Sequence, residues 1–137
     1  TEAVEAIKST GNDKLILLQC VTNYPSHFEN ANAKAMVTLK ERFDAPVGYS
    51  DHTPGFIVPM ASVALGGCVI EKHFTDDKTR KGPDHPFAMD AKDFRTMVDY
   101  IRLLEKVLVK EGIPFVPSFL LALLATFIWG NLLLLIF

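Results

Sequence analysis

The chain has 137 residues, of which 49% are hydrophobic, and its formal net charge at pH 7 is -2. No stretch of Lys and Arg is dense enough to follow a phosphate backbone, which argues against a nucleic-acid-binding protein. The apolar excess lies mostly in residues 113–137, so this segment and the part before it are interpreted separately.

Helical and extended patterns alternate along the first part. Val4 and Ile7, followed by Gly11, predict the end of a helix that begins before this sequence. Asp90 is placed to cap a late helix, whose apolar positions from Phe94 to Leu108 fall on one face. Between them we expect, in order, a strand over 15–20, a helix over 33–43, a strand over 46–50, a helix over 57–65 and a strand over 68–74.

Strands that alternate with helices of this length pair in parallel through right-handed crossovers, so the predicted class is α/β. All three strands carry polar groups at their C-terminal ends, where barrel enzymes keep their chemistry. No phosphate-cradling Gly-rich fingerprint follows the first strand, which counts against a dinucleotide fold. We therefore predict a partial (β/α)8 TIM barrel, the last three βα units, followed by a single hydrophobic helix.

His52 and His73 each end a short apolar run. If those runs are neighbouring parallel strands, the two imidazoles project from one rim into the same space. Side chains alternate faces along a strand, so Ser50 should share the face of His52, and Glu71 that of His73. On the first strand, Thr22 and Tyr24 share a parity with Cys20, and the loop that carries Asp84 and His85 would close over the mouth.

Two imidazoles would suit a divalent ion such as Mn²⁺, Fe²⁺ or Zn²⁺, with positions left for substrate oxygens. A structural alternative stays open, because histidines 21 residues apart fit no compact ligand spacing. Ser50 and Thr22 could equally be caps or turn formers. Both cysteines, Cys20 and Cys68, are expected to be reduced core thiols of a cytoplasmic protein.

Five segments in chain order carry a family resemblance: Leu17-Leu-Gln-Cys-Val-Thr-Asn-Tyr-Pro-Ser26, Pro46-Val-Gly-Tyr-Ser-Asp-His-Thr53, Ala64-Leu-Gly-Gly, Ile70-Glu-Lys-His-Phe-Thr75 and Lys81-Gly-Pro-Asp-His85. Through them, the chain from Glu2 to Val109 resembles the sialic acid synthase (N-acetylneuraminate synthase) family. The resemblance implies residues 1–111 as the C-terminal part of a synthase barrel, with strands six, seven and eight.

The resemblance also implies a reaction. In this family, phosphoenolpyruvate condenses with the open-chain aldehyde of an N-acetylated amino sugar, N-acetylmannosamine or its 6-phosphate, to a nine-carbon 2-keto acid. The implied cofactor is a divalent ion, Mn²⁺ or Mg²⁺, and the family is homodimeric. By motif, His52 and His73 resemble the metal ligands of the family, Ser50 and Thr22 resemble residues near phosphoenolpyruvate, and Tyr24 and Asp84 resemble contacts to the amino sugar. Asn23 could replace Thr22 in that role.

The family pattern stops near Glu111, and residues 112–137 are predicted to form a transmembrane helix, since the 19 residues from Phe119 to Phe137 would reach roughly 28 Å. The sequence of this segment faintly resembles membrane segments of archaeal-type prepilin peptidases. Three explanations for the joint, the change of pattern near Glu111, stay open: a natural tail-anchored chain, a core helix mistaken for a membrane span, or a chimeric reading frame. The alternative function is a non-catalytic, membrane-tethered half-barrel module that pairs with another protein.

The resemblance implies that acid–base residues of the first five barrel strands are absent here. We therefore expect the purified chain to form no keto acid from phosphoenolpyruvate, N-acetylmannosamine and Mn²⁺. Colorimetric detection of the 2-keto acid measures this directly, with a complete synthase as the positive control. Keto acid formed above the rate without protein would contradict the expectation.

Overall fold

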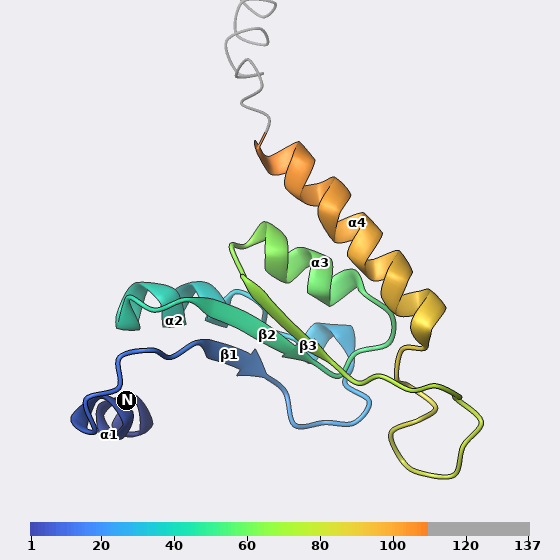
Figure 1. The fold of residues 1–137 in the computed structure, drawn as a ribbon, viewed down its shortest axis with the longest axis horizontal. Coiled ribbons are helices and arrows are strands. Elements are labelled where there is room, and N and C mark those ends of the chain that lie inside the picture. The colour runs from blue at the N-terminus through green and yellow to red at the C-terminus, as the bar shows by residue number, and fades with distance from the viewer. Residues whose placement is uncertain (110–137) are drawn as a thin grey trace, which may run out of the picture. The chain divides into compact units, whose positions relative to one another are not determined.

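The computed structural model describes residues 1–109, with side chains to residue 107, and residues 1–106 form one compact unit. Helices and strands alternate through it, as the sequence predicts (Figure 1). In chain order the elements are α1 (Glu2–Ser9), β1 (Leu17–Cys20), a 3-10 turn (Phe28–Asn30), α2 (Ala35–Phe43), β2 (Val47–Asp51), α3 (Ile57–Ala64), β3 (Val69–Lys72) and α4 (Ala91–Val109).

The three strands form one parallel sheet in the order β1-β2-β3. Cys20 pairs with Ser50, and Ser50 with Glu71, so their side chains leave the sheet on the same face. Sequential parallel strands joined by helices confirm the α/β class. Asp90 accepts a 2.9 Å hydrogen bond from the backbone N–H of Asp93, so it caps α4 as expected.

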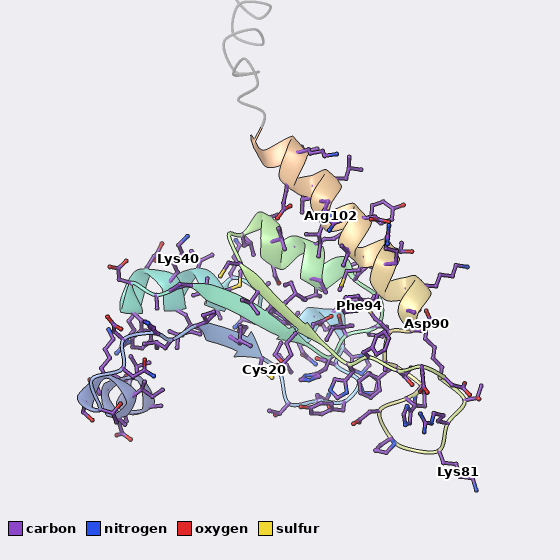
Figure 2. All side chains as sticks on the ribbon, in the orientation of Figure 1. Cys20, Lys40, Lys81, Asp90, Phe94 and Arg102 are labelled. Carbon is purple, nitrogen blue, oxygen red and sulfur yellow. The ribbon has the colours of Figure 1, made fainter. Side chains whose placement is uncertain are left out.

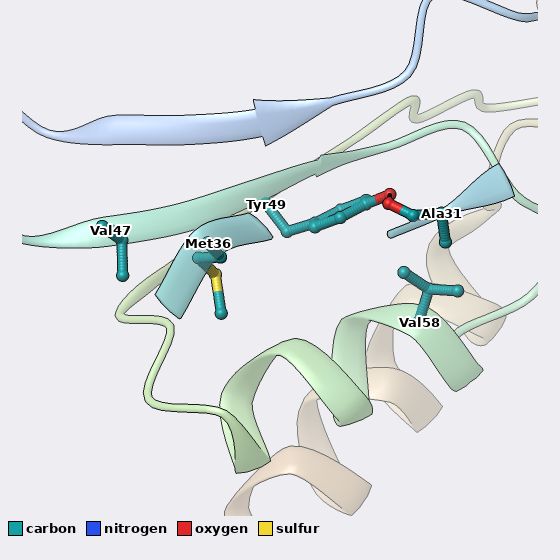
Figure 3. Packing of buried hydrophobic residues seen from close by; sticks show 5 residues of the cluster. All are labelled: Ala31, Met36, Val47, Tyr49 and Val58. Carbon is teal, nitrogen blue, oxygen red and sulfur yellow. Dashed lines mark hydrogen bonds between the residues drawn. The ribbon is translucent and has the colours of Figure 1, made fainter. Parts of the chain in front are cut away.

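The core lies between the sheet and the two crossover helices (Figure 3). Val47 and Tyr49 of β2 meet Met36 of α2 and Val58 of α3, so both helices cover the same face. The Tyr49 hydroxyl donates a 2.5 Å hydrogen bond to the carbonyl of Ala31, which satisfies its polar end inside the core. Helices gathered on one face are what consecutive units of a barrel would show.

On the opposite face of the sheet, β2 and β3 approach each other closely at Gly48. A Cβ built there would lie 2.3 Å from the Val69 carbonyl oxygen, so only glycine fits. Cys20 lies on this face, away from α2 and α3 (Figure 2). Both Cys20 and Cys68 are free and exposed, so the prediction of core thiols is wrong. The reason is that Cys20 faces away from the helix-covered core, while Cys68 stands just before β3.

Within the described range, the structure contains no helix that combines the length and the apolar character needed to cross a bilayer. The predicted transmembrane segment at 112–137, the joint near residue 111 and the prepilin-peptidase likeness all fall outside the described residues.

Burial raises the pKa of Tyr49 to about 12, and the nearby Asp51 carboxylate adds to the shift. Because the folded pKa lies above the unfolded value, the stabilisation is complete below about pH 10 and is lost as the pH rises towards 12. We expect Tyr49→Phe to remove this loss and to cost about 0.5–1.5 kcal/mol at neutral pH. Urea unfolding from pH 8 to pH 12 measures both effects.

The matched control is Tyr100→Phe, because Tyr100 is half-exposed. This variant should keep the wild-type fall in unfolding free energy at high pH. An identical pH dependence in Tyr49→Phe and wild type would show that Tyr49 does not carry it.

Candidate functional site

Two histidines stand side by side at the C-terminal rim of the sheet. Asp51 and Lys72 are the last residue pair of the β2–β3 register, and His52 and His73 follow them directly. Their ring centroids are 5.2 Å apart, and the ring planes meet at 68°. Parallel register therefore brings together two imidazoles that are 21 residues apart in sequence.

His52 is buried, and hydrogen bonds hold both its ring and its backbone. Its Nδ1 lies 2.7 Å from the carbonyl oxygen of Val21. Because a carbonyl oxygen only accepts, Nδ1 must donate, and in the neutral imidazole Nε2 keeps its lone pair. The His52 carbonyl in turn accepts a 2.8 Å hydrogen bond from the N–H of Ser26. This is the arrangement expected of a metal-ligating or proton-accepting Nε2.

His73 is approached by the loop between β3 and α4. Its Nδ1 lies 3.7 Å from Asp84 Oδ2, which is beyond hydrogen-bond length. The His73 carbonyl accepts a 2.9 Å hydrogen bond from the N–H of Met89, which fixes the far end of the loop. His85 binds within the loop itself, where its Nδ1 lies 2.8 Å from the Thr75 hydroxyl.

Two aromatic rings border the histidines. The Tyr24 ring lies 4.0 Å from that of His52 and 5.7 Å from that of His73. Phe87, from the loop after β3, lies 5.1 Å from His73 and 6.3 Å from Tyr24. Sequence reasoning missed Phe87, since a single Phe in a polar loop carries no periodic signal.

Below the histidines on the same face, Ser50 donates a 2.6 Å hydrogen bond to Glu71 Oε1. This contact joins β2 and β3 one layer inside the rim, and Glu71 is exposed. Thr22 is exposed two residues beyond β1, and in the described part of the chain no hydrogen bond or ion pair links its side chain to this cluster. The structure thus joins Ser50 to Glu71 on the histidine face, and Thr22 lies between Val21 and Tyr24, which both contact His52.

On the helix-covered face, the two residues that precede the histidines form an ion pair. Lys72 Nζ lies 2.7 Å from Asp51 Oδ2, and both side chains are buried. Sequence reasoning missed this pair. The signal was available: two opposite charges occupy matching positions in apolar runs, which the register of two parallel strands would place side by side.

Charges anchor the β3–α4 loop to the start of α4, where Asp90 lies (Figure 2). Lys78 contacts Asp93 and lies 3.5 Å from Asp90, and its hydrogen bond to Asp93 raises the Lys78 pKa. The backbone N–H of Asp93 lowers the pKa of Asp90, with the Lys78 ammonium assisting. Asp90 is therefore held as a carboxylate. The contacts of Lys78 also attach the loop that carries Asp84 to the start of α4.

The two imidazoles are suited to supply part of a metal-ligand set. Imidazoles that share one ion have ring centres about 5 Å apart, because each nitrogen lies about 2.1 Å from the ion. The observed 5.2 Å separation fits this geometry. Across residues 1–109, however, no group of three or more His, Cys, Asp and Glu residues is placed to hold a metal ion. Further ligands would have to come from elsewhere.

Comparison with known proteins identifies relatives of the chain. A family model described as the NeuB family matches residues 1–112. An N,N'-diacetyllegionaminic acid synthase of Legionella pneumophila is 52% identical over 97 residues, covering 71% of this chain and 27% of the synthase.

Two solved structures resemble the chain with TM-scores of 0.75. One is the spore coat polysaccharide biosynthesis protein SpsE of Bacillus subtilis, 39% identical, covering 78% of this chain and 30% of that one. The other is the N-acetylneuraminic acid synthetase of Leptospira borgpetersenii in complex with citrate, 36% identical, covering 82% and 39%. The chain thus spans about a third of the length of its relatives.

The contact between His52 Nδ1 and the Val21 carbonyl predicts one tautomer. In the neutral ring we expect the proton on Nδ1, which long-range ¹H–¹⁵N correlation spectra of the imidazoles report. The exposed His27 serves as the control, because solvent leaves it free to exchange between tautomers. A His52 ring protonated on Nε2 would contradict the geometry.

Proposed function

Since the chain belongs to the NeuB family, we propose that its three βα units form one side of the active site of a sialic acid synthase-type enzyme. The proposed reaction condenses phosphoenolpyruvate with the aldehyde of an N-acetylated amino sugar, N-acetylmannosamine or its 6-phosphate. Its products are a nine-carbon 2-keto acid and phosphate. Relatives that synthesise legionaminic acid and N-acetylneuraminic acid support this substrate class.

The observation that carries the proposal is the pair of neighbouring imidazoles at the C-terminal rim, whose ring centroids are 5.2 Å apart. Barrel enzymes place their chemistry at this rim. The Val21 carbonyl holds Nδ1 of His52, so Nε2 of that ring is the atom left for a ligand, and Asp84 lies 3.7 Å from Nδ1 of His73.

His52 and His73 are the residues that would hold a divalent cation, Mn²⁺ or Mg²⁺, through Nε2. When bound, the cation would polarise the aldehyde oxygen of the sugar. The chain's own part is to present two neighbouring imidazoles, with the tautomer of His52 set by the Val21 carbonyl, and to leave the remaining ligand positions to substrate, water or other segments of a complete barrel.

The other proposed roles follow the positions around the rim. Ser50 would bind phosphoenolpyruvate, because its hydroxyl stands on the same face as the histidines and is already directed across to β3. Thr22 is assigned to the same substrate, and its exposed position beyond β1 leaves its hydroxyl accessible. Tyr24 and Asp84 approach the histidines from two different loops and would contact the amino sugar.

A metal titration of the full chain tests this proposal. We expect Mn²⁺ to bind, with each of His52→Ala and His73→Ala weakening binding by about 10-fold or more, since each removes one of two protein ligands. The loss of the free Mn²⁺ signal in electron paramagnetic resonance spectra measures the bound fraction.

The matched control is His27→Ala, because this exposed histidine lies outside the cluster and should leave Mn²⁺ affinity unchanged. A wild-type chain that takes up no Mn²⁺, or histidine variants that bind as well as wild type, would overturn the proposal.

A further inference from the structure

A buried ion pair backs the rim that carries the two histidines. Lys72 Nζ lies 2.7 Å from Asp51 Oδ2, and the two side chains are 1% and 0% exposed. Lys72 also donates to the carbonyl oxygen of Thr53. Asp51 Oδ1 accepts hydrogen bonds from the Thr53 N–H and hydroxyl, at 3.0 and 2.9 Å. A single lysine of β3 thereby holds the residues on both sides of His52.

The position of this network matters because the strand pairing ends there. Asp51 and Lys72 are the last residues in register between β2 and β3, and the histidines come one residue later. Alternation along the strands sends the charged pair to the helix-covered face and the imidazoles to the other. Past the last register pair, the side-chain network of Asp51, Lys72 and Thr53 ties the end of β2 to the end of β3.

The energetics favour a geometric role over simple stabilisation. Burying two charges carries a desolvation cost, and a well-packed apolar pair at such a position is often as stable or more stable. Once formed, however, a buried pair resists displacement, because separating the partners leaves an uncompensated charge in the interior. A buried pair at this place is therefore suited to fixing the spacing of the two strand ends.

We propose that Asp51 and Lys72 are positioning residues that set the separation and direction of the His52 and His73 imidazoles, so that both Nε2 atoms meet one divalent cation. This inference rests on the metal-binding role proposed above. It predicts that metal affinity and coordination geometry depend on a pair that itself touches neither the cation nor the substrate.

Co²⁺ binding to the full chain tests the inference, because the visible absorption bands of Co²⁺ report the coordination geometry as well as the affinity. Lys72→Met and Asp51→Asn are expected to weaken Co²⁺ binding by about 10- to 100-fold and to shift the bands. Lys72→Arg keeps the positive charge and should retain most of the affinity. Arg95→Met removes an exposed i,i+4 ion pair with Asp99 on α4 and should change neither quantity.

The variant Tyr49→Phe distinguishes a general loss of stability from a displacement of the two imidazoles. This variant weakens the same strand on the same face but leaves the ion pair intact, so it should lower the urea midpoint without moving the Co²⁺ bands. If Lys72→Met fails to fold, the nearly isosteric Asp51→Asn decides the question.

Wild-type binding that persists with unchanged bands and affinity in a folded Lys72→Met or Asp51→Asn chain would overturn this inference alone. A wild-type chain that binds no Co²⁺ would overturn the proposed metal role, and this inference with it.

Discussion

The in-register parallel pairing of β2 with β3 is the constraint on which the rest of the structure depends. It sets Ser50 beside Glu71 and Asp51 beside Lys72, and it delivers His52 and His73 together at the next position. A slip of β3 by one residue would send the His73 imidazole to the face opposite that of His52. Gly48 helps to hold the pairing, because its missing Cβ lets the Val69 carbonyl approach.

That pairing also divides the work between the two faces of the sheet. One face carries Val47 and Tyr49 into the core against α2 and α3, and it buries the Asp51–Lys72 pair. The other face carries Ser50, Glu71 and the histidines, and its exposed Cys20 shows that it is not packed as a core. The stability of the unit and the chemistry of its rim are thus built from alternate residues of the same short strands.

Much of this could be predicted from the sequence. The alternation of apolar runs with helical stripes gave the α/β class and each element to within a few residues, because strand and helix periods differ strongly. Parity along the strands placed Ser50 and Glu71 on the histidine face. The motif resemblance pointed to the family to which the chain belongs.

The remaining features of the site depend on contacts that the sequence periodicity does not predict. The approach of Phe87 and Asp84 to His73 is set by the path of an irregular loop, which the Lys78 contacts with Asp90 and Asp93 hold in place. The hydrogen bond from His52 to the Val21 carbonyl depends on how the chain leaves β1. The exposure of Cys20 was missed because an apolar run does not tell which of its two faces is covered.

The central claim is that two imidazoles on neighbouring strand ends meet at one cation. A crystal structure of the chain grown with Mn²⁺, with anomalous difference density recorded for the metal, tests this most directly. The account predicts a single peak within about 2.1 Å of Nε2 of both His52 and His73, the length of a metal–imidazole bond. A peak on one ring only, on the Nδ1 atoms or away from both histidines would contradict it.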